Sequence, residues 1–168
     1  MWVGQRLCAF DAYGLAPYLD YLGVDLTAKN IANARRRFPG VRFEVADILD
    51  LPYPDASFDL VIASDIFEHL SPDGLERALD EVARLSRTAA VLNFFNMGEQ
   101  PEHDVERRRA YYWSCLSRPL IAARLGRSFG ALNVIPIATW LRDQFGYAHT
   151  YNANAYTIQA DRREGPPD

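Results

Sequence analysis

Three aspartates each end an apolar stretch that has the composition of a buried strand. Asp25 ends YLGVD, Asp47 ends VRFEVAD and Asp65 ends FDLVIASD. A strand needs no charge at its end, whereas a carboxylate there is able to accept hydrogen bonds from a ligand. Ligands of parallel α/β sheets bind at the carboxyl ends of the strands. Three acids at equivalent strand ends therefore predict a binding site.

The first two acids occupy places that favour particular ligand groups. Asp25 lies at the end of the second expected strand, where a carboxylate is suited to accept two hydrogen bonds from a ribose diol. Asp47 ends the next strand, where it could accept from an adenine amino group while a following backbone N–H meets a ring nitrogen. Each acid has a structural alternative, since Asp25 could cap the following helix and Asp47 could be a turn aspartate.

The third acid belongs to SDIFEHL, in which Asp65, Glu68 and His69 are spaced i, i+3 and i+4. If that turn is helical, the three side chains share one face and could bind a divalent metal, with His103 completing the set. The favoured interpretation places Glu68 and His69 at a polar turn between strand and helix, with no metal.

A cluster of aromatic residues is the remaining candidate for ligand contact. Tyr111, Tyr112 and Trp113 are adjacent and could form the wall of a substrate pocket. The alternative is that they are divided between core and surface. The sequence does not identify the substrate.

These residues are positioned by segments that alternate between strand and helix patterns. Strands are expected at 5–10, 21–26, 41–47, 58–65, 88–96 and 155–161, with another apolar segment at 131–137. Helical patterns cover 27–38, the segment that begins at Ser71-Pro72, the region from about 111 to 125, and 139–146. Such alternation predicts a single α/β domain with a Rossmann-like, doubly wound and mostly parallel sheet between two helical layers, a three-layer α/β/α architecture.

The segment from Tyr21 to Leu70 resembles the class I S-adenosylmethionine-dependent methyltransferases. The resemblance is carried by the acid after LGV, by ADILDLPYPDASFD and by FDLVIASDIFEHL, and it covers about residues 20 to 96. It implies that the last strand, near 154–160, runs antiparallel to its neighbours. It also implies a cofactor site, in which Asp25 binds the ribose, Asp47 and Ile48 bind the adenine, and Leu26, Ser64 and Asp65 lie along the cofactor.

The segment before Asp25 departs from the family pattern. Members carry a glycine-rich loop after the first strand, where the backbone approaches the methionine end of the cofactor and a side chain would block it. Here the corresponding stretch is LCAFDAYG, with Gly14 as its one glycine and its expected cofactor contact. The candidate first strand is QRLCAF, which should lie between the strands at 21–25 and 58–63.

The expected function is S-adenosylmethionine-dependent methyl transfer to a small-molecule acceptor. Transfer from a sulfonium depends mostly on holding the acceptor in line, so the sequence assigns no catalytic residue. The weak glycine loop motivates an alternative, a non-catalytic remnant of the fold with a binding or scaffolding role. A nicotinamide-dependent oxidoreductase would need a G-x-G-x-x-G phosphate cradle, and the sequence contains none.

Composition limits the partners. The 168-residue chain has a formal charge of −4, which argues against nucleic acid, and its arginine runs ARRRF and ERRRA are expected on solvated helix faces. No apolar run approaches about 18 residues, so no membrane partner is expected. Cys8 and Cys115 lie far apart and fit a reducing cytoplasm. Residues 97–128 are expected to form a substrate-side insertion and 161–168 a frayed tail.

Overall fold

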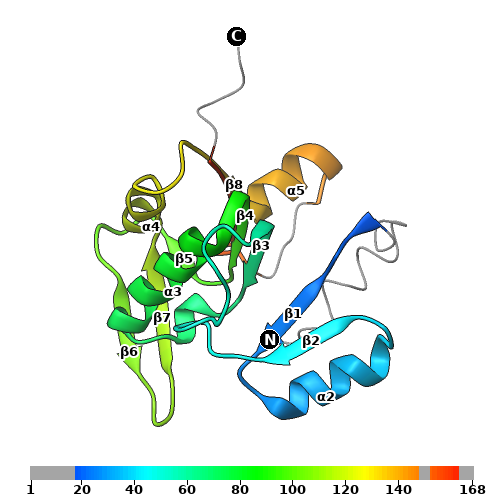
Figure 1. Ribbon diagram of the computed structural model, residues 1–168. Coiled ribbons are helices and arrows are strands. Elements are labelled where there is room, and N and C mark those ends of the chain that lie inside the picture. The colour runs from blue at the N-terminus through cyan, green and yellow to red at the C-terminus, as the bar shows by residue number, and fades with distance from the viewer. Residues whose placement is uncertain (1–17, 148–151, 163–168) are drawn as a thin grey trace. The chain divides into compact units, whose positions relative to one another are not determined.

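The computed structural model describes residues 18–147 and 152–162 (Figure 1). The expected strand at 5–10 and Gly14 lie outside the described residues. The chain divides into two compact units after Pro52, and each is described by itself. No helix of the described residues combines the length and the apolar composition that crossing a bilayer requires.

The first unit is a strand–helix–strand motif. Strand β1 (Leu22–Asp25) leads into helix α2 (Ala28–Arg37), which returns the chain to strand β2 (Arg42–Val45). The two strands pair in parallel, and the core beneath the helix contains Ile31, Ala34 and Phe43. Burying a large apolar side chain of this kind contributes roughly 1.5–3 kcal/mol. All three elements were predicted from the hydrophobic pattern.

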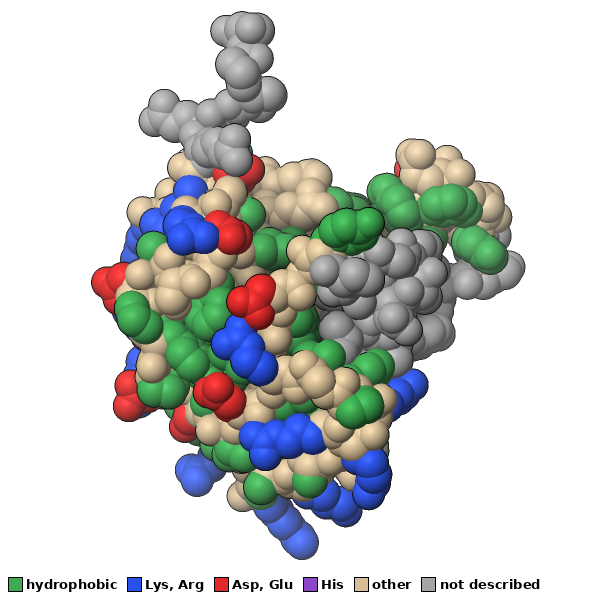
Figure 2. All heavy atoms as spheres, turned by 45° about the vertical axis from the view of Figure 1, so that its right-hand side comes forward, with side chains coloured by type: hydrophobic (Ala, Val, Ile, Leu, Met, Phe, Trp, Pro, Cys, Tyr) green, Lys and Arg blue, Asp and Glu red, His purple; other side chains and the backbone are tan. Residues whose placement is uncertain are grey.

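Helix α2 ends in a run of three arginines. Arg35, Arg36 and Arg37 lie in its last turn, where cations interact favourably with the helix dipole, and all three are exposed. Figure 2 shows Lys and Arg side chains spread over the lower part of the view, where α2 lies. The chain then reverses at Gly40, whose φ of +90° favours glycine. This run therefore lies on a solvated helix face, as predicted.

The second unit contains a four-stranded sheet in the order β3-β4-β9-β8. Its strands are β3 (Phe58–Ser64), β4 (Ser86–Phe94), β8 (Ala131–Pro136) and β9 (Tyr156–Asp161). β3 and β4 are parallel, whereas β9 runs antiparallel to both β4 and β8. The prediction of an antiparallel last strand is therefore confirmed.

A smaller sheet of the second unit has the order β5-β7-β6. It consists of β5 (Met97–Gly98), β6 (Asp104–Arg107) and β7 (Tyr112–Ser117). The described helices of the second unit are the short 3₁₀ helix η2 (Phe67–His69), α3 (Pro72–Leu85), α4 (Arg118–Leu125) and α5 (Ile137–Phe145). In Figure 1, β6 and β7 form a hairpin. The described strands thus form separate sheets with both parallel and antiparallel pairs. The α/β class is confirmed, and the described residues do not show a single mostly parallel sheet.

The prediction of helix from residue 111 was wrong for its first half. Residues 112–117 form β7, with Ser114 and Leu116 buried and Trp113 exposed, which is the two-residue alternation of a strand. The pairing with β6 is antiparallel and brings together residues that the chain separates, so local helix propensity does not decide the outcome. The run ERRRA consequently lies in β6 and the following turn, exposed but not helical.

Helix α3 follows its sequence signals closely. The Ser71 side chain accepts a hydrogen bond from the Gly74 N–H at 3.0 Å, with Pro72 in the first turn. Such a cap contributes about 1 kcal/mol. The face carrying Leu75, Leu79 and the other expected apolar residues is buried, and in Figure 1 the helix lies along β3 and β4. The predicted helix start and core face are confirmed.

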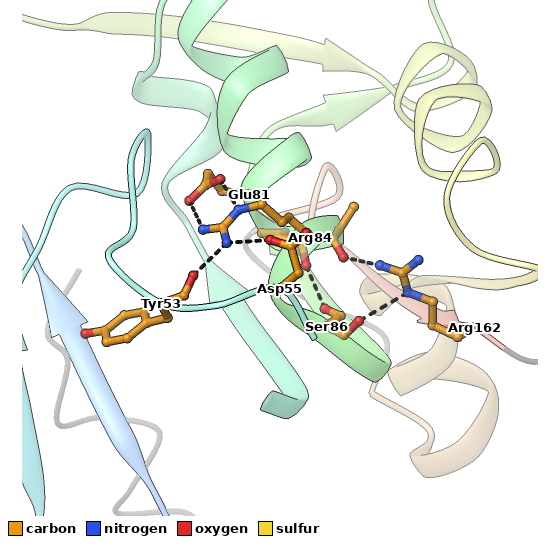
Figure 3. Close-up of polar contacts among 8 residues, drawn as sticks. Tyr53, Asp55, Glu81, Arg84, Ser86 and Arg162 are labelled. Atoms are coloured by element: carbon orange, nitrogen blue, oxygen red, sulfur yellow. Dashed lines mark hydrogen bonds and ion pairs between the residues drawn. The ribbon is translucent and has the colours of Figure 1, made fainter. Parts of the chain in front are cut away.

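Two arginines, Arg84 and Arg162, join the C-terminal part of α3 to the loop before β3 and to the residue after β9 (Figure 3). Arg84 of α3 donates to the Tyr53 carbonyl at 2.6 Å and to Asp55 at 2.9 Å, which holds the loop before β3. Arg162 donates to the carbonyl of Ser86 at 3.2 Å and to that of Ala83. The chain is thus anchored through Arg162, and the rest of the expected tail lies outside the described residues.

Candidate functional site

The structure brings Asp25 and Asp47 to the same edge of the first unit. Asp25 is the last residue of β1, opposite Val45 at the end of the parallel strand β2. The Ala46 N–H donates to the Asp25 carbonyl at 3.2 Å, which extends the pairing by one residue. Asp47 is the next residue after Ala46, so both carboxylates lie at the carboxyl ends of the two strands, which is where parallel α/β sheets bind ligands.

The Asp25 side chain is held by the start of α2. Its Oδ1 accepts from the Thr27 N–H at 2.8 Å, and the Asn30 side-chain amide lies 3.2 and 3.1 Å from the two oxygens. The Thr27 side chain makes no capping hydrogen bond. The Asp25 carboxylate therefore supplies the acceptor at the start of α2, which is the structural alternative given above for this acid. A carboxylate offers about four acceptor sites, and Asp25 is half-buried. Its structural contacts therefore fix its orientation without using its whole acceptor capacity.

Asp47 also has a local role. Its Oδ1 accepts from the Leu49 N–H at 3.0 Å, and its carbonyl accepts from the Asp50 N–H at 3.1 Å. This is the side-chain-stabilised turn that was the structural alternative. Asp47 is exposed and Ile48 half-buried, while Leu26 beside Asp25 is 69% exposed. All four residues thus lie at or next to one strand edge.

Ser64 is the last residue of β3 in the second unit and Asp65 follows it, and the two residues differ in environment. Ser64 is buried, and its Oγ accepts from the Asn93 side chain at 2.7 Å; Asn93 in turn accepts from Thr157 at 2.7 Å. Asp65 has φ +53° and donates its N–H to the Asn93 carbonyl at 2.9 Å. A non-glycine residue in this left-handed region is strained, and such strain clusters at functional sites.

Glu68 points into the protein. It is fully buried, and its Oε1 accepts from the backbone N–H groups of Phe95 at 2.7 Å and Asn96 at 3.2 Å. Its Oε2 has no hydrogen-bond partner among the described residues. Burial, opposed by the backbone N–H groups and reinforced by the charge of Asp65, raises the pKa of Glu68 to about 7. This carboxyl joins η2 to the end of β4.

The geometry does not support the alternative metal site on Asp65, Glu68 and His69. Glu68 is engaged by backbone, and His69 turns its Nδ1 to the Tyr112 carbonyl at 3.2 Å. His103 accepts from the Ser117 N–H at 2.8 Å through its Nδ1, and burial lowers its pKa. In the part of the chain that the structure describes, no three acidic, histidine or cysteine side chains are grouped as metal ligands.

His69 instead lies in a group of rings that we call the aromatic cluster: His69, Phe95, Tyr111 and Trp113. The centroid of the His69 ring lies 5.3 Å from that of Phe95, 5.7 Å from that of Tyr111 and 5.6 Å from that of Trp113, and Phe95 lies 5.2 Å from Trp113. Tyr111 is 49% exposed and Trp113 41%. Two of the three predicted aromatics thus contribute rings, whereas Tyr112 contributes its carbonyl.

Phe95 was missed by the sequence reasoning, although a signal was present. The expected strand TAAVLNFFN has two adjacent phenylalanines before its last residue, and neighbouring strand residues point to opposite faces. Phe94 is buried and stacks on Phe67 at 5.1 Å, so its neighbour had to turn away from that core.

A pocket of about 160 Å³ lies elsewhere in the second unit, at the first turns of α3. Its lining includes Leu75, His103 and Ser114, and the Ser114 hydroxyl is buried without a hydrogen-bond partner among the described residues. Because Ser114 and Trp113 are adjacent in β7, they face opposite sides of that strand. The pocket is therefore distinct from the aromatic cluster.

Comparisons with known proteins identify the family. A family model described as "Methyltransferase domain" matches residues 4–89, just over half of the chain. A probable pectin methylesterase of Arabidopsis thaliana is 37% identical over 91 residues, which is 54% of this chain and 33% of that protein. A fatty-acid O-methyltransferase of Mycolicibacterium smegmatis is 36% identical over 87 residues, 51% of this chain and 30% of that protein.

Solved structures agree with this result at the level of the fold. An S-adenosylmethionine-dependent methyltransferase from Mesorhizobium loti superposes with a TM-score of 0.66 and 19% identity, covering 93% of this chain and 85% of that one. The alignments with the two curated relatives span about a third of those proteins' length. Together with the family match, these comparisons show that the chain belongs to the class I S-adenosylmethionine-dependent methyltransferases.

Proposed function

We propose that this protein transfers a methyl group from S-adenosylmethionine to a small-molecule acceptor. The observation that carries the proposal is the placement of Asp25 and Asp47 at one strand edge, in a chain of a family that uses this donor. Leu26, Ile48, Ser64 and Asp65 are proposed as further cofactor contacts. Gly14 stays a prediction outside the described residues.

The residues at this edge fit the chemistry of the cofactor. A ribose diol offers two O–H donors, and Asp25 is a half-buried acceptor whose orientation is fixed by Thr27 and Asn30. Asp47 would accept from the adenine amino group, next to the backbone N–H of Ile48. The bound cofactor supplies an electrophilic methyl group on a sulfonium. The protein's own contribution would be binding, orientation and exclusion of water.

The acceptor is proposed at the level of a small molecule only. The curated relatives carry names that refer to pectin and to a fatty acid, which are chemically unlike, and the alignments cover only part of each protein. The segment 97–128, which holds β5, β6, β7 and α4, is proposed as the acceptor side of the protein.

Calorimetric titration of the purified chain with S-adenosylmethionine and with S-adenosylhomocysteine tests the proposal. Binding of both is expected, and Asp25→Asn should weaken it by about 10- to 150-fold because a hydrogen-bonding charge is lost. Asp59→Ala is the control, since Asp59 is an exposed acid paired with Arg87. A folded chain that binds neither compound at millimolar concentration would contradict the proposal and favour the non-catalytic remnant.

A further inference from the structure

The aromatic cluster presents rings and a hydrogen-bonding atom at one place on the second unit. Tyr111 and Trp113 both leave a large part of their surface exposed, so their rings are accessible to a ligand. His69 is only half-buried between them. Ligand sites combine aromatic walls with a few placed polar groups, and His69 is the polar group here.

The tautomer of His69 follows from its neighbour. Its Nδ1 lies 3.2 Å from the Tyr112 carbonyl oxygen, and a carbonyl only accepts, so Nδ1 must carry the proton. In the neutral ring Nε2 is then an acceptor. Among the described residues Nε2 has no hydrogen-bond partner. The hydrogen bond at Nδ1 thus fixes the orientation of the ring, and Nε2 is available to accept a hydrogen bond from a ligand.

The surrounding contacts hold the cluster in place. Glu68 fixes the backbone of Phe95 through the N–H···Oε1 bond of 2.7 Å, and the Phe95 ring packs on both His69 and Trp113. Two neighbouring residues therefore hold Phe95 in place: the buried Glu68 accepts from its backbone N–H, and the half-buried His69 packs against its ring. His69 also lies four residues after Asp65, the proposed cofactor contact, across the single turn η2.

We propose that the aromatic cluster binds the methyl acceptor, and that this acceptor is a flat ring bearing an O–H or N–H group that donates to Nε2 of His69. The inference rests on the proposed function. As the acceptor reacts, its O–H or N–H bond breaks and the proton passes to Nε2. The freed electron pair forms the bond to the methyl carbon, and sulfur keeps the pair of the broken carbon–sulfur bond.

Two probe molecules separate ring stacking from hydrogen bonding: 2-naphthol, and 2-methoxynaphthalene, which has the same ring system without the O–H donor. Both are titrated at saturating S-adenosylhomocysteine. The wild-type chain should bind 2-naphthol about 5- to 10-fold more tightly, the usual worth of one hydrogen bond. His69→Phe keeps a ring and should remove this preference. Equal binding of the two probes to the wild-type chain, or no binding of either, would overturn the proposal.

Matched tryptophan variants locate the site. Trp113→Leu should weaken both probes by about 3- to 10-fold through lost stacking. Trp140→Leu should leave both unchanged, although Trp140 is equally exposed at 44% and also packs on a phenylalanine, Phe145. An effect of Trp140→Leu as large as that of Trp113→Leu would assign the binding to exposed aromatics in general.

Nitrogen NMR of the wild-type imidazoles avoids dependence on variants. The Nε2 resonance of His69 should shift with 2-naphthol and not with 2-methoxynaphthalene, and an unmoved resonance would contradict the proposal even if a variant misfolds. S-adenosylhomocysteine is titrated separately. If it binds and the naphthols do not, the acceptor class is wrong and the proposed function stands. If it does not bind, the proposed function fails, and any ring binding is no longer that of a methyl acceptor.

Discussion

The strand ends of the two units carry acidic residues and use them in opposite ways. At the edge formed by β1 and β2, Asp25 and Asp47 bond to nearby backbone N–H groups of the next turn and keep contact with solvent. After β3, the acid Glu68 is fully buried and bonds to backbone N–H groups of a distant strand end. Burial separates the two sets of acids. Glu68 is enclosed and connects distant parts of the chain, whereas Asp25 and Asp47 hold only the turn that follows them and keep part of their surface in solvent.

The largest effect is expected at the buried acid. Glu68→Ala removes the acceptor of two backbone N–H groups, each costing roughly 1–3 kcal/mol when left buried and unpaired. We expect the free energy of unfolding to fall by about 2–5 kcal/mol in urea denaturation. Glu102→Ala, at an exposed site, should change it by less than about 0.5 kcal/mol. Similar small losses in both variants would remove the contrast between buried and exposed acids.

Stability should depend on pH through the same carboxyl. The folded-state pKa of Glu68 is raised from 4.5 to about 7, so the protonated form is favoured by folding. The stabilisation is fully present below pH 4.5 and is lost as the pH rises through about 7. At about 1.4 kcal/mol per pKa unit, the loss is roughly 3 kcal/mol over that window.

The variant Glu68→Gln provides the comparison for this pH dependence. It keeps an oxygen acceptor for Phe95 and Asn96 and removes the titration. Urea denaturation of the wild-type protein and of Glu68→Gln is compared at about pH 4.5 and about pH 8, on either side of the raised pKa. As the pH rises, the wild-type protein should lose free energy of unfolding relative to Glu68→Gln, because only the wild type has a carboxyl that ionises at this site. A difference that is flat with pH would contradict the raised pKa.

Asp25 combines a structural role with its proposed ligand role. Its carboxylate accepts hydrogen bonds from the Thr27 N–H and the Asn30 side chain, which hold the start of α2. Asp25→Ala should lower the free energy of unfolding by about 1 kcal/mol and also weaken cofactor binding. Thermal melts and titrations of the same variant measure the two effects. Loss of stability with unchanged cofactor affinity would leave Asp25 with the helix-capping role alone.

The smallest effect on stability is expected at Asp47. Its one side-chain bond, to the Leu49 N–H, lies in an exposed turn, so Asp47→Ala should reduce the free energy of unfolding by about 0.5 kcal/mol or less. Its effect on S-adenosylhomocysteine affinity should be the larger of the two, measured by calorimetry. The reverse order would make Asp47 an ordinary turn residue.

Local signals predicted much of the fold. The helix from Pro72, its Ser71 cap and its buried face follow from spacing and capping chemistry within a few residues, and the hydrophobic spacing of α2 acts in the same way. β7 was missed because its strand state depends on pairing with β6 across a turn. Sequence patterns describe such non-local pairing poorly.

The places of the acids along the chain were predicted better than their contacts. Asp25 ends β1, and Asp47 and Asp65 follow the ends of β2 and β3 within two residues, as the apolar runs indicated. The grouping of Asp65 with Glu68 and His69 assumed an α-helical turn, whereas the chain takes a left-handed conformation at Asp65 and then a 3₁₀ turn. This backbone geometry sends Glu68 inward and His69 to the rings, and residue spacing alone does not encode it.

The proposed function depends on Asp25 binding the ribose of S-adenosylmethionine. A double-mutant cycle tests it most directly, by titrating wild type and Asp25→Asn with S-adenosylhomocysteine and with its 2′,3′-dideoxyribose analogue. Removing the ribose hydroxyls should weaken binding to the wild type by about 10- to 150-fold and binding to Asp25→Asn far less, because the two changes remove the same contact. Equal losses in both proteins would show that the diol binds elsewhere and would contradict the account.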